Sequence, residues 1–231
     1  MAGFRGGTGG TVVVAVDGLA GAGKSTVARA VAAALGCPYL DTGAFYRAVT
    51  LAVVRAGADA ASEQAVLQVT AAACLDYAAG AMLLDGEDVS EAVRTPEVGA
   101  LVSAVSAFPE VRRLVVERQR DWVEEHGGRV VVEGRDIGTV VFPEAAVKVF
   151  LTASAAARAR RRVADAEAAG QTLQDVEDHL RARDHADSTR AASPLRSAAD
   201  AVTIDTTDLT VAQVVAVILG LIAEAEGDAG R

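Results

Sequence analysis

Runs of apolar, β-branched residues alternate along this chain with stretches in which apolar residues recur every three to four positions. The runs are short and almost wholly apolar, which is typical of parallel strands buried on both faces; they lie at 11–16, 37–41, 128–133, 147–151 and 201–205. The helical repeat marks 27–35, 44–55, 97–107, 109–125 and 208–226. Pro109 fits a first helical turn, and Asp208 fits an N-cap. Strands alternating with helices predict a doubly wound α/β fold around a five-stranded parallel sheet.

The pattern changes between residues 62 and 100. A helical stretch at 63–73 is followed by short strand-like pieces near 74–77, 81–84 and 88–89, which Gly80 and Gly86 separate as turns. We expect a core of 11–61 and 101–226, an inserted subdomain at 62–100 with a small antiparallel sheet, and a flexible tail at 1–10. The last apolar run, 211–223, contains Gln213 and is too short to span a bilayer, so it predicts a packed helix.

The first strand runs directly into Gly18-x4-Gly23-Lys24-Ser25, the phosphate-binding loop pattern, and a helix follows at once. Glycine lets such a loop bend and bring its N–H groups onto phosphate oxygens. In this pattern the lysine reaches the β- and γ-phosphates, and the serine hydroxyl ligates Mg²⁺. The chain has 22 lysines and arginines, yet only Lys24 and Lys148 are lysines. In a chain that otherwise uses mainly arginine, the lysine at position 24 indicates that this position requires a compact ammonium.

Polar residues follow other strand ends, where open α/β sheets bind their ligands. Thr42 and Arg47, one turn apart, indicate either an anion site or a capped helix with a solvated arginine, and the pattern does not decide between them. Glu133 fits the position that holds Mg²⁺-bound water beside a phosphate loop. Arg135 and Asp136, which follow it, are available to a second substrate.

Arginines gather in the last third of the chain, at Arg158, Arg160, Arg161, Arg162, Arg181, Arg183, Arg190 and Arg196. Interspersed acids bring the charge of this tract near zero, and the whole chain has a formal net charge of −9, which disfavours a nucleic-acid surface. An ion-paired helix face explains some of these arginines. A mobile cover suits the others better, because arginines can clamp the spread negative charge of a transferring phosphoryl group.

Several of these motifs occur in one order: Asp17-Gly-x-x-Gly-x-Gly-Lys-Ser25, Asp41-Thr-Gly-Ala-x-Tyr-Arg47, Glu133-Gly-Arg-Asp-x-Gly-Thr139 and Arg183-Asp-x-x-Asp-x-x-Arg190. Together they resemble the bacterial cytidylate kinases, which are nucleoside monophosphate kinases of the adenylate-kinase-like type. The resemblance runs from Thr11 to about Glu226 and includes Gly86-Glu-Asp-Val89, Arg94-Thr95 and Ser106-Ala-Phe-Pro-x-Val-Arg112. It implies a cytosolic, monomeric phosphate-loop kinase that transfers the γ-phosphoryl group of ATP to CMP or dCMP with Mg²⁺, within pyrimidine nucleotide metabolism.

The resemblance also implies a role for individual residues. The ATP phosphates would bind Gly18, Gly21, Ala22, Gly23, Lys24, Ser25 and Thr26. The CMP phosphate would bind Thr42, Arg47, Arg135 and Arg190, the cytosine Ser103, Arg112 and Asp136, and the sugar Arg183 and Asp187. The catalytic cations would be Lys24, Arg135, Arg158 and Arg162, with the register within Arg158 to Arg162 left open. Mg²⁺ would bind Ser25 and, through water, Glu133.

Two positions depart from the family pattern, and two segments would move. Leu19 stands where proline is common, and Glu133 stands where aspartate is common, which lengthens the reach toward metal-bound water by one methylene. The insert 62–100 and a helical lid at 154–172 would close over both nucleotides and exclude water, which protects ATP from hydrolysis.

Other functions are weighed against the same residues. A phosphate-loop GTPase reads guanine with Asn-Lys-x-Asp, and the sequence contains no asparagine. Charge and length disfavour a nucleic-acid-stimulated ATPase. A kinase of the same fold that acts on another nucleoside monophosphate, or on a metabolite such as shikimate, stays open. Cys37 and Cys74 are widely spaced and fit reduced thiols of a cytoplasmic protein. From the charge and the short apolar runs we expect neither a nucleic-acid nor a membrane partner.

Overall fold

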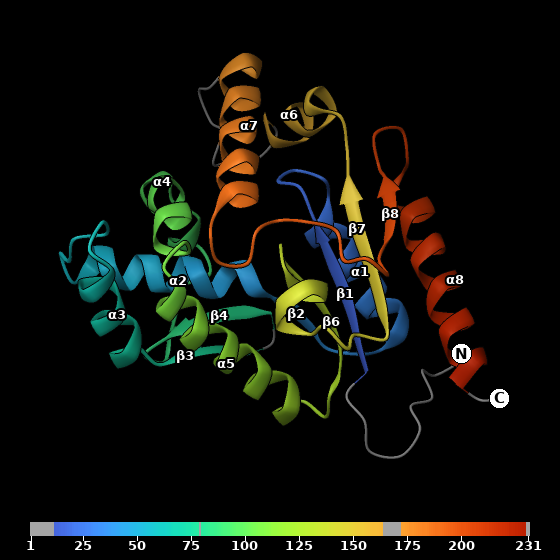
Figure 1. The fold of residues 1–231 in the computed structure, drawn as a ribbon, viewed down its shortest axis with the longest axis horizontal. Helices are drawn as coiled ribbons and strands as arrows, with labels where there is room; N and C mark the ends of the chain where they lie inside the picture. The colour runs from blue at the N-terminus through green and yellow to red at the C-terminus, as the bar shows by residue number, and fades with distance from the viewer. Residues whose placement is uncertain (1–11, 79, 164–171, 230–231) are drawn as a thin grey trace. The chain divides into compact units, whose positions relative to one another are not determined.

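The computed structural model describes residues 12–78, 80–163 and 172–229 and divides into two compact units (Figure 1). Unit 1 comprises Met1–Leu40, Val123–Thr189 and Ser193–Arg231, and unit 2 comprises Asp41–Trp122 and Arg190–Ala192. Unit 2 contains the whole predicted insert 62–100 and extends beyond it on both sides. The predicted tail 1–10 and residues 164–171 of the predicted lid lie outside the described residues.

Unit 1 is built on a five-stranded sheet, and the predicted α/β fold is confirmed. The strands follow the order β2 (Tyr39–Asp41), β6 (Arg129–Glu133), β1 (Val12–Gly18), β7 (Val147–Thr152) and β8 (Val202–Asp205). β1 pairs in parallel with β6 and β7, and β7 pairs in parallel with β8. The chain visits β2 and β6 on one side of β1 before it crosses to β7 on the other. The carboxyl end of β1 is therefore the point where the strand order switches, the usual place for a ligand.

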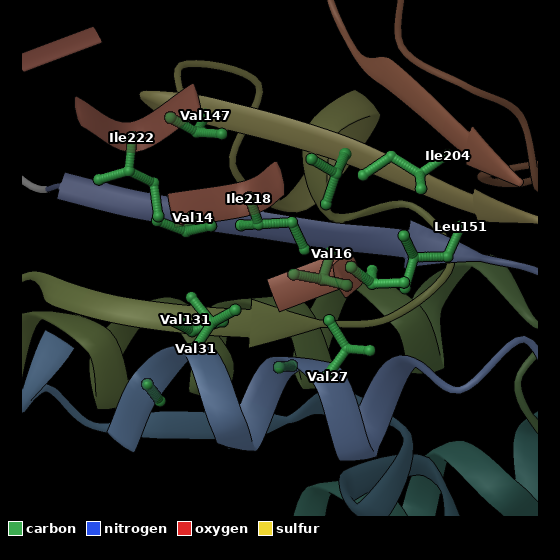
Figure 2. Packing of buried hydrophobic residues seen from close by; sticks show 14 of the residues in the cluster. Val14, Val16, Val27, Val31, Val131, Val147, Leu151, Ile204, Ile218 and Ile222 are labelled. Carbon is green, nitrogen blue, oxygen red and sulfur yellow. The ribbon is translucent and has the colours of Figure 1, made fainter. Parts of the chain in front are cut away.

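One face of this sheet is covered by α1 (Lys24–Leu35) and α8 (Val211–Ala229). Figure 2 shows the contact layer, in which alternate residues of β1 face the apolar stripes of both helices. The labelled residues of this layer are Val14, Val16, Val27, Val31, Val131, Val147, Leu151, Ile204, Ile218 and Ile222, all buried. Later in the chain, α6 (Ala155–Val163) packs against α7 (Leu173–Thr189).

The N-cap predicted at Asp208 is wrong. α8 begins at Val211, and the Thr210 hydroxyl accepts the N–H of Gln213 at 3.3 Å. Gln213 Oε1 in turn accepts the backbone N–H of Thr210 at 2.9 Å. This reciprocal pair is a capping box, which satisfies two backbone donors where a single aspartate satisfies one.

Unit 2 contains the predicted small antiparallel sheet, with β3 (Leu75–Ala78), β4 (Ala81–Leu84) and β5 (Glu87–Asp88) in that order. Its helical segments are α2 (Thr42–Arg55), α3 (Glu63–Ala72), the short η1 (Ala92–Arg94), α4 (Pro96–Val105) and α5 (Pro109–Glu125). Trp122 anchors the sheet to α5, because its indole N–H donates to the Tyr77 carbonyl at 2.6 Å. Within the described residues, no helix combines the length and apolar character needed to cross a membrane.

Candidate functional site

The phosphate loop takes its shape from glycines at the carboxyl end of β1. Gly18 has a φ of 144°, and a Cβ there would lie 2.1 Å from the Leu151 carbonyl oxygen. Only glycine lets β1 run this close to β7, where Leu19 N–H donates to the same oxygen at 3.1 Å. Gly23, with a φ of 89°, precedes α1 and has no side chain to cap it. The first-turn N–H groups of α1 can therefore serve an anion.

Lys24 is buried at the start of α1, and its ammonium donates to the Leu19 carbonyl at 2.8 Å. Burial, followed by the positive charge of Arg135, lowers the pKa of Lys24 to about 7. The carboxylates of Glu133 and Asp17 act in the opposite direction. A buried ammonium close to a second positive charge is stabilised when an anion binds beside it. This environment therefore favours phosphate binding.

Ser25 and Glu133 meet beside the lysine. The Ser25 hydroxyl donates to Glu133 Oε1 at 2.7 Å, and Glu133 is buried at the end of β6, in register with Val16 of β1. The described residues hold no group of three acidic, histidine or cysteine side chains for a metal. Mg²⁺ at a nucleotide needs only one or two protein oxygens besides water and phosphate, so the donor set fits this ion. Glutamate in place of the more common aspartate still reaches the serine.

Asp17, to which the sequence assigned no role, organises the neighbouring loop. Its carboxylate accepts the N–H groups of Ile137 and Gly138, both at 2.8 Å. Burial raises the pKa of Asp17 to about 6, although the two backbone bonds act to lower it. These N–H groups open a π-helical turn, η2 (Ile137–Val141), and Asp17 thereby fixes the backbone just after the buried Asp136. In the sequence Asp17 stood at a strand end and opened the phosphate-loop motif, but nothing there connected it to residues 137 and 138.

Three predicted acceptor-binding residues of unit 1, Arg135, Arg183 and Asp187, lie together near Lys24. The guanidinium of Arg135 donates through Nε to Asp187 Oδ2 at 3.0 Å, and both side chains are largely buried. Arg183, on the same helix as Asp187, also lowers the pKa of Lys24 by its charge, which ties it to this cluster. The structure thus brings together Lys24, Arg135, Arg183 and Asp187.

Arg158 is buried rather than exposed as a cover residue would be. Its guanidinium donates to the carbonyls of Ala153 at 3.1 Å and Ala20 at 3.0 Å, and it pairs with Asp184. Arg162 is half-buried on the same helix. Asp184 was quoted in a sequence motif without a role, so this pairing was missed.

A second support of the loop was also missed. Arg161 donates to the hydroxyl and the carbonyl of Thr206, at 3.0 Å and 2.6 Å. The Thr206 hydroxyl shares its one hydrogen between the Ala22 carbonyl of the phosphate loop, at 3.1 Å, and the Thr152 carbonyl of β7, at 3.0 Å. No periodic pattern connects residues this far apart in the chain, so the sequence carried no signal for the contact.

In unit 2 the predicted residues lie on α2, α4 and α5. Asp41 caps α2 by accepting the Ala44 N–H at 3.1 Å, which leaves Thr42 buried in the first turn. Arg47 Nη1 donates to the Val93 carbonyl at 3.0 Å. Ser103 is half-buried on α4, and Arg190 is half-buried in the short return of the chain to this unit.

Arg112 is the most constrained of the predicted residues in unit 2. It is buried, its Nη1 donates to the Ser106 carbonyl at 3.0 Å, and its guanidinium lies 4.9 Å from the centroid of the Tyr46 ring. The Ser106 hydroxyl donates to the Ser103 carbonyl at 3.2 Å. Arg112 and Ser103, predicted to face one base, are therefore linked through Ser106.

A family model and several named proteins match this sequence over almost the whole chain. The sequence model of a family described as Cytidylate kinase matches residues 14–224. A protein named Cytidylate kinase from Mycobacterium avium (strain 104) is 53% identical over 210 residues, which cover 88% of this chain and 92% of that protein. Its namesake from Rhodococcus opacus (strain B4) is 49% identical over 223 residues, covering 94% and 97%.

A solved structure of an uncharacterized protein from Eubacterium ventriosum ATCC 27560 is similar to this chain in fold alone. It has a TM-score of 0.52 and 12% sequence identity, and the match covers 93% of this chain and 99% of that one.

Proposed function

Because the chain belongs to the cytidylate kinase family, we propose that it transfers the γ-phosphoryl group of ATP to CMP or dCMP, giving ADP and CDP or dCDP. The observation that carries this proposal is the donor cluster at the carboxyl end of β1. Lys24 is buried beside the bonded pair of Ser25 and Glu133, at the foot of a loop whose glycines leave N–H groups for phosphate.

The donor half of the reaction belongs to the phosphate loop. Gly18, Gly21, Ala22, Gly23, Lys24, Ser25 and Thr26 would bind the ATP phosphates. Ser25 would ligate Mg²⁺ directly and Glu133 through water, and the ion would neutralise charge on the phosphates. Lys24 and Arg135 would stabilise the negative charge that develops during transfer, with Arg158 and Arg162 as the further predicted cations.

The acceptor residues are carried over from the family and stay predictions. Thr42, Arg47, Arg135 and Arg190 would hold the CMP phosphate, while Arg183 and Asp187 would hold the sugar. The bond between Arg135 and Asp187 supports placing the phosphate-binding and sugar-binding residues of unit 1 side by side. Ser103, Arg112 and Asp136 would read the cytosine. The fixed guanidinium of Arg112 supports this, because a buried, held donor discriminates better than a mobile one.

The proposed phosphoryl transfer requires little help from a general base. The second pKa of a phosphate monoester is about 6, so the acceptor is already ionised near neutral pH. In-line positioning and charge stabilisation would then supply the rate acceleration. A cytoplasmic monomer in pyrimidine nucleotide metabolism, and the roles of 62–100 and 154–172 in covering the nucleotides, also stay predictions.

A coupled ADP-release assay tests the proposal. With ATP and Mg²⁺, the acceptors CMP, dCMP, UMP, dTMP, AMP, GMP and shikimate are compared at equal concentration. We expect CMP and dCMP to give the highest kcat/KM. A reaction without acceptor measures ATP hydrolysis, and chelation followed by added Mg²⁺ tests the metal. A higher kcat/KM with any other acceptor would contradict the proposal.

A further inference from the structure

The phosphate loop is held at its apex by a carboxylate that lies far from it in the chain. Asp184 of α7 accepts the Ala20 N–H through Oδ1 at 3.2 Å, and its Oδ2 pairs with Arg158 of α6. Arg158 in turn donates to the Ala20 carbonyl at 3.0 Å. Both backbone groups of Ala20 are therefore fixed by one ion pair, and α6 and α7 are fixed to the loop together.

Apolar packing and close approach reinforce the same contact. Ala20 belongs to a small buried cluster with Ala159 of α6 and with Val176 and Leu180 of α7. A Cβ added at Gly21 would lie 3.2 Å from the Cβ of Arg158, so the loop and α6 touch. α6 and α7, yellow and orange in Figure 1, pack on each other as well. The loop apex thus sits on two helices rather than on the sheet alone.

We propose that Asp184 is a positioning residue for the ATP phosphates, which acts by holding Ala20 and Arg158 in fixed relation. The Ala20 peptide lies among the residues whose N–H groups line the phosphate loop, and its orientation decides where the neighbouring N–H groups point. The carboxylate also neutralises Arg158, which is 5% exposed and would otherwise be a buried charge without compensation. This inference rests on the proposed donor role of the loop and adds a residue to it.

The test is Asp184→Asn, with Asp178→Asn as the matched control. The asparagine keeps the shape, but it has one acceptor oxygen for two donors and turns an N–H toward Arg158 or Ala20. Asp178 lies on the same helix, 60% exposed, so its substitution makes the same change of charge without the contact. ATP affinity is measured by calorimetry in Mg²⁺ buffer without acceptor, and KM is measured for ATP and for CMP.

We expect Asp184→Asn to weaken ATP binding and raise its KM by about 10- to 100-fold, the range for losing a hydrogen bond to a charged group. The KM for CMP should change less than about twofold, and Asp178→Asn should match the wild type. A folded Asp184→Asn protein with wild-type ATP affinity, or with equal losses for ATP and CMP, overturns the proposal. A merely structural role would lower the melting temperature or the active fraction and would leave the KM for ATP unchanged.

Asp184→Glu provides a second variant should the asparagine protein not fold. It keeps the charge opposite Arg158 and displaces the carboxylate by one methylene, so ATP affinity should be intermediate. Wild-type affinity in a folded Asp184→Glu protein also overturns the proposal. The calorimetric result stands even if the wild type does not phosphorylate CMP, so failure of the proposed acceptor and failure of this inference are distinguishable.

Discussion

Unit 1 and unit 2 bury different kinds of polar side chain. Among the described residues, unit 1 buries mainly charged groups, which are Asp17, Lys24, Glu133, Asp136, Arg158 and Asp187. Unit 2 buries mainly hydroxyls and an amide, at Thr42, Thr50, Thr70, Ser106 and Gln119, with Arg112 as its charged member. A buried charge is expensive, whereas a buried hydroxyl bonded to its own helix is cheap. Charges retained in the core at such a cost point to function, whereas hydroxyls bonded to their own helix, such as those of Thr50 and Thr70, point to packing.

The hydroxyls of unit 2 illustrate the second case. Thr50 donates to the Tyr46 carbonyl at 2.8 Å, and Thr70 donates to the Val66 carbonyl at 2.7 Å, both one turn back in the helix. Such bonds satisfy the side chain locally and bring no group to a ligand. Lys24 differs from them, because burial lowers its pKa to about 7. Substitutions of the buried charges in unit 1 and of the buried hydroxyls in unit 2 test this difference.

The largest effect is expected from Lys24→Arg. A planar guanidinium cannot replace a compact ammonium in the loop, so turnover should fall by about 10²- to 10³-fold, as on loss of a group that stabilises the transition state. Lys148→Arg is the matched control, because Lys148 pairs with Asp200 at 2.7 Å and an arginine can keep that pair. The coupled assay with CMP measures both. Near wild-type turnover in folded Lys24→Arg would remove the donor role of Lys24.

A smaller effect is expected at Asp136. A carboxylate accepts from the 4-amino group of cytosine and repels the 4-carbonyl of uracil, whereas an asparagine can donate to that carbonyl. Asp136→Asn should therefore lower the ratio of kcat/KM for CMP over UMP by roughly 10- to 100-fold, mostly through lost CMP activity. The exposed Asp208→Asn should leave the ratio unchanged. An unchanged ratio in Asp136→Asn would move base discrimination to Ser103 and Arg112.

The buried ammonium of Lys24 should lower the free energy of unfolding, by an amount that depends on pH. Lys24→Met removes the buried charge, so the melting temperature should rise by about 2–6 °C at pH 6, or roughly 1–2 kcal/mol for a chain of this size. The folded pKa of Lys24, about 7, lies below the ordinary lysine pKa of 10.5, so the unfolded chain binds the extra proton between these two values. Wild-type stability therefore rises with pH across that window, and the advantage of Lys24→Met shrinks toward pH 10.

Thermal unfolding at pH 6, 8 and 9.5 measures this dependence. Lys148→Met serves as the control, since it loses the ion pair with the exposed Asp200 and should gain no stability at any pH. A Lys24→Met protein less stable than the wild type at pH 6 would show that the buried ammonium is stabilising.

The smallest effects are expected from Thr50→Val and Thr70→Val in unit 2. Each removes one local hydrogen bond, and the accepting carbonyl keeps its helical bond, so unfolding should become easier by less than about 1 kcal/mol. The KM values for ATP and CMP should not move. Denaturant unfolding and the coupled assay check both statements, and a several-fold change in either KM would place these hydroxyls with the functional set.

The fold could be predicted from the sequence because its signals are local. Near-continuous apolar runs fixed the strands of the parallel sheet, and Gly80 and Gly86 marked the turns of the small antiparallel one. The phosphate loop was predicted from one contiguous motif, and Ser25 and Glu133 do meet. The cap of α8 was misassigned because Asp208 and Thr210 are both good cap residues, and only the reciprocal bond with Gln213 decides between them.

The remaining features depend on contacts that no local pattern encodes. The π-helical turn after Asp136 exists because Asp17, distant in the chain, binds two of its N–H groups. Arg158 was predicted as a lid cation from the resemblance to the cytidylate kinases. Its burial against Ala20 and Asp184 required the packed arrangement of α6 and α7. Such tertiary pairings escape reasoning from periodicity and composition.

The supports of the phosphate loop also have a consequence for the order in which the protein is made. Ala20 leaves the ribosome before its partner Asp184, which follows 164 residues later, and Ala22 leaves before Thr206, which follows 184 residues later. At about 5–20 residues per second, synthesis takes roughly 10–40 s to supply these partners. A nascent chain therefore contains the complete phosphate-loop motif before it contains Asp184 and Thr206, the residues that hold the loop in shape. Chains released before Asp184 and Thr206 should hold ATP poorly, so unfinished copies would withdraw little of the nucleotide from the cell.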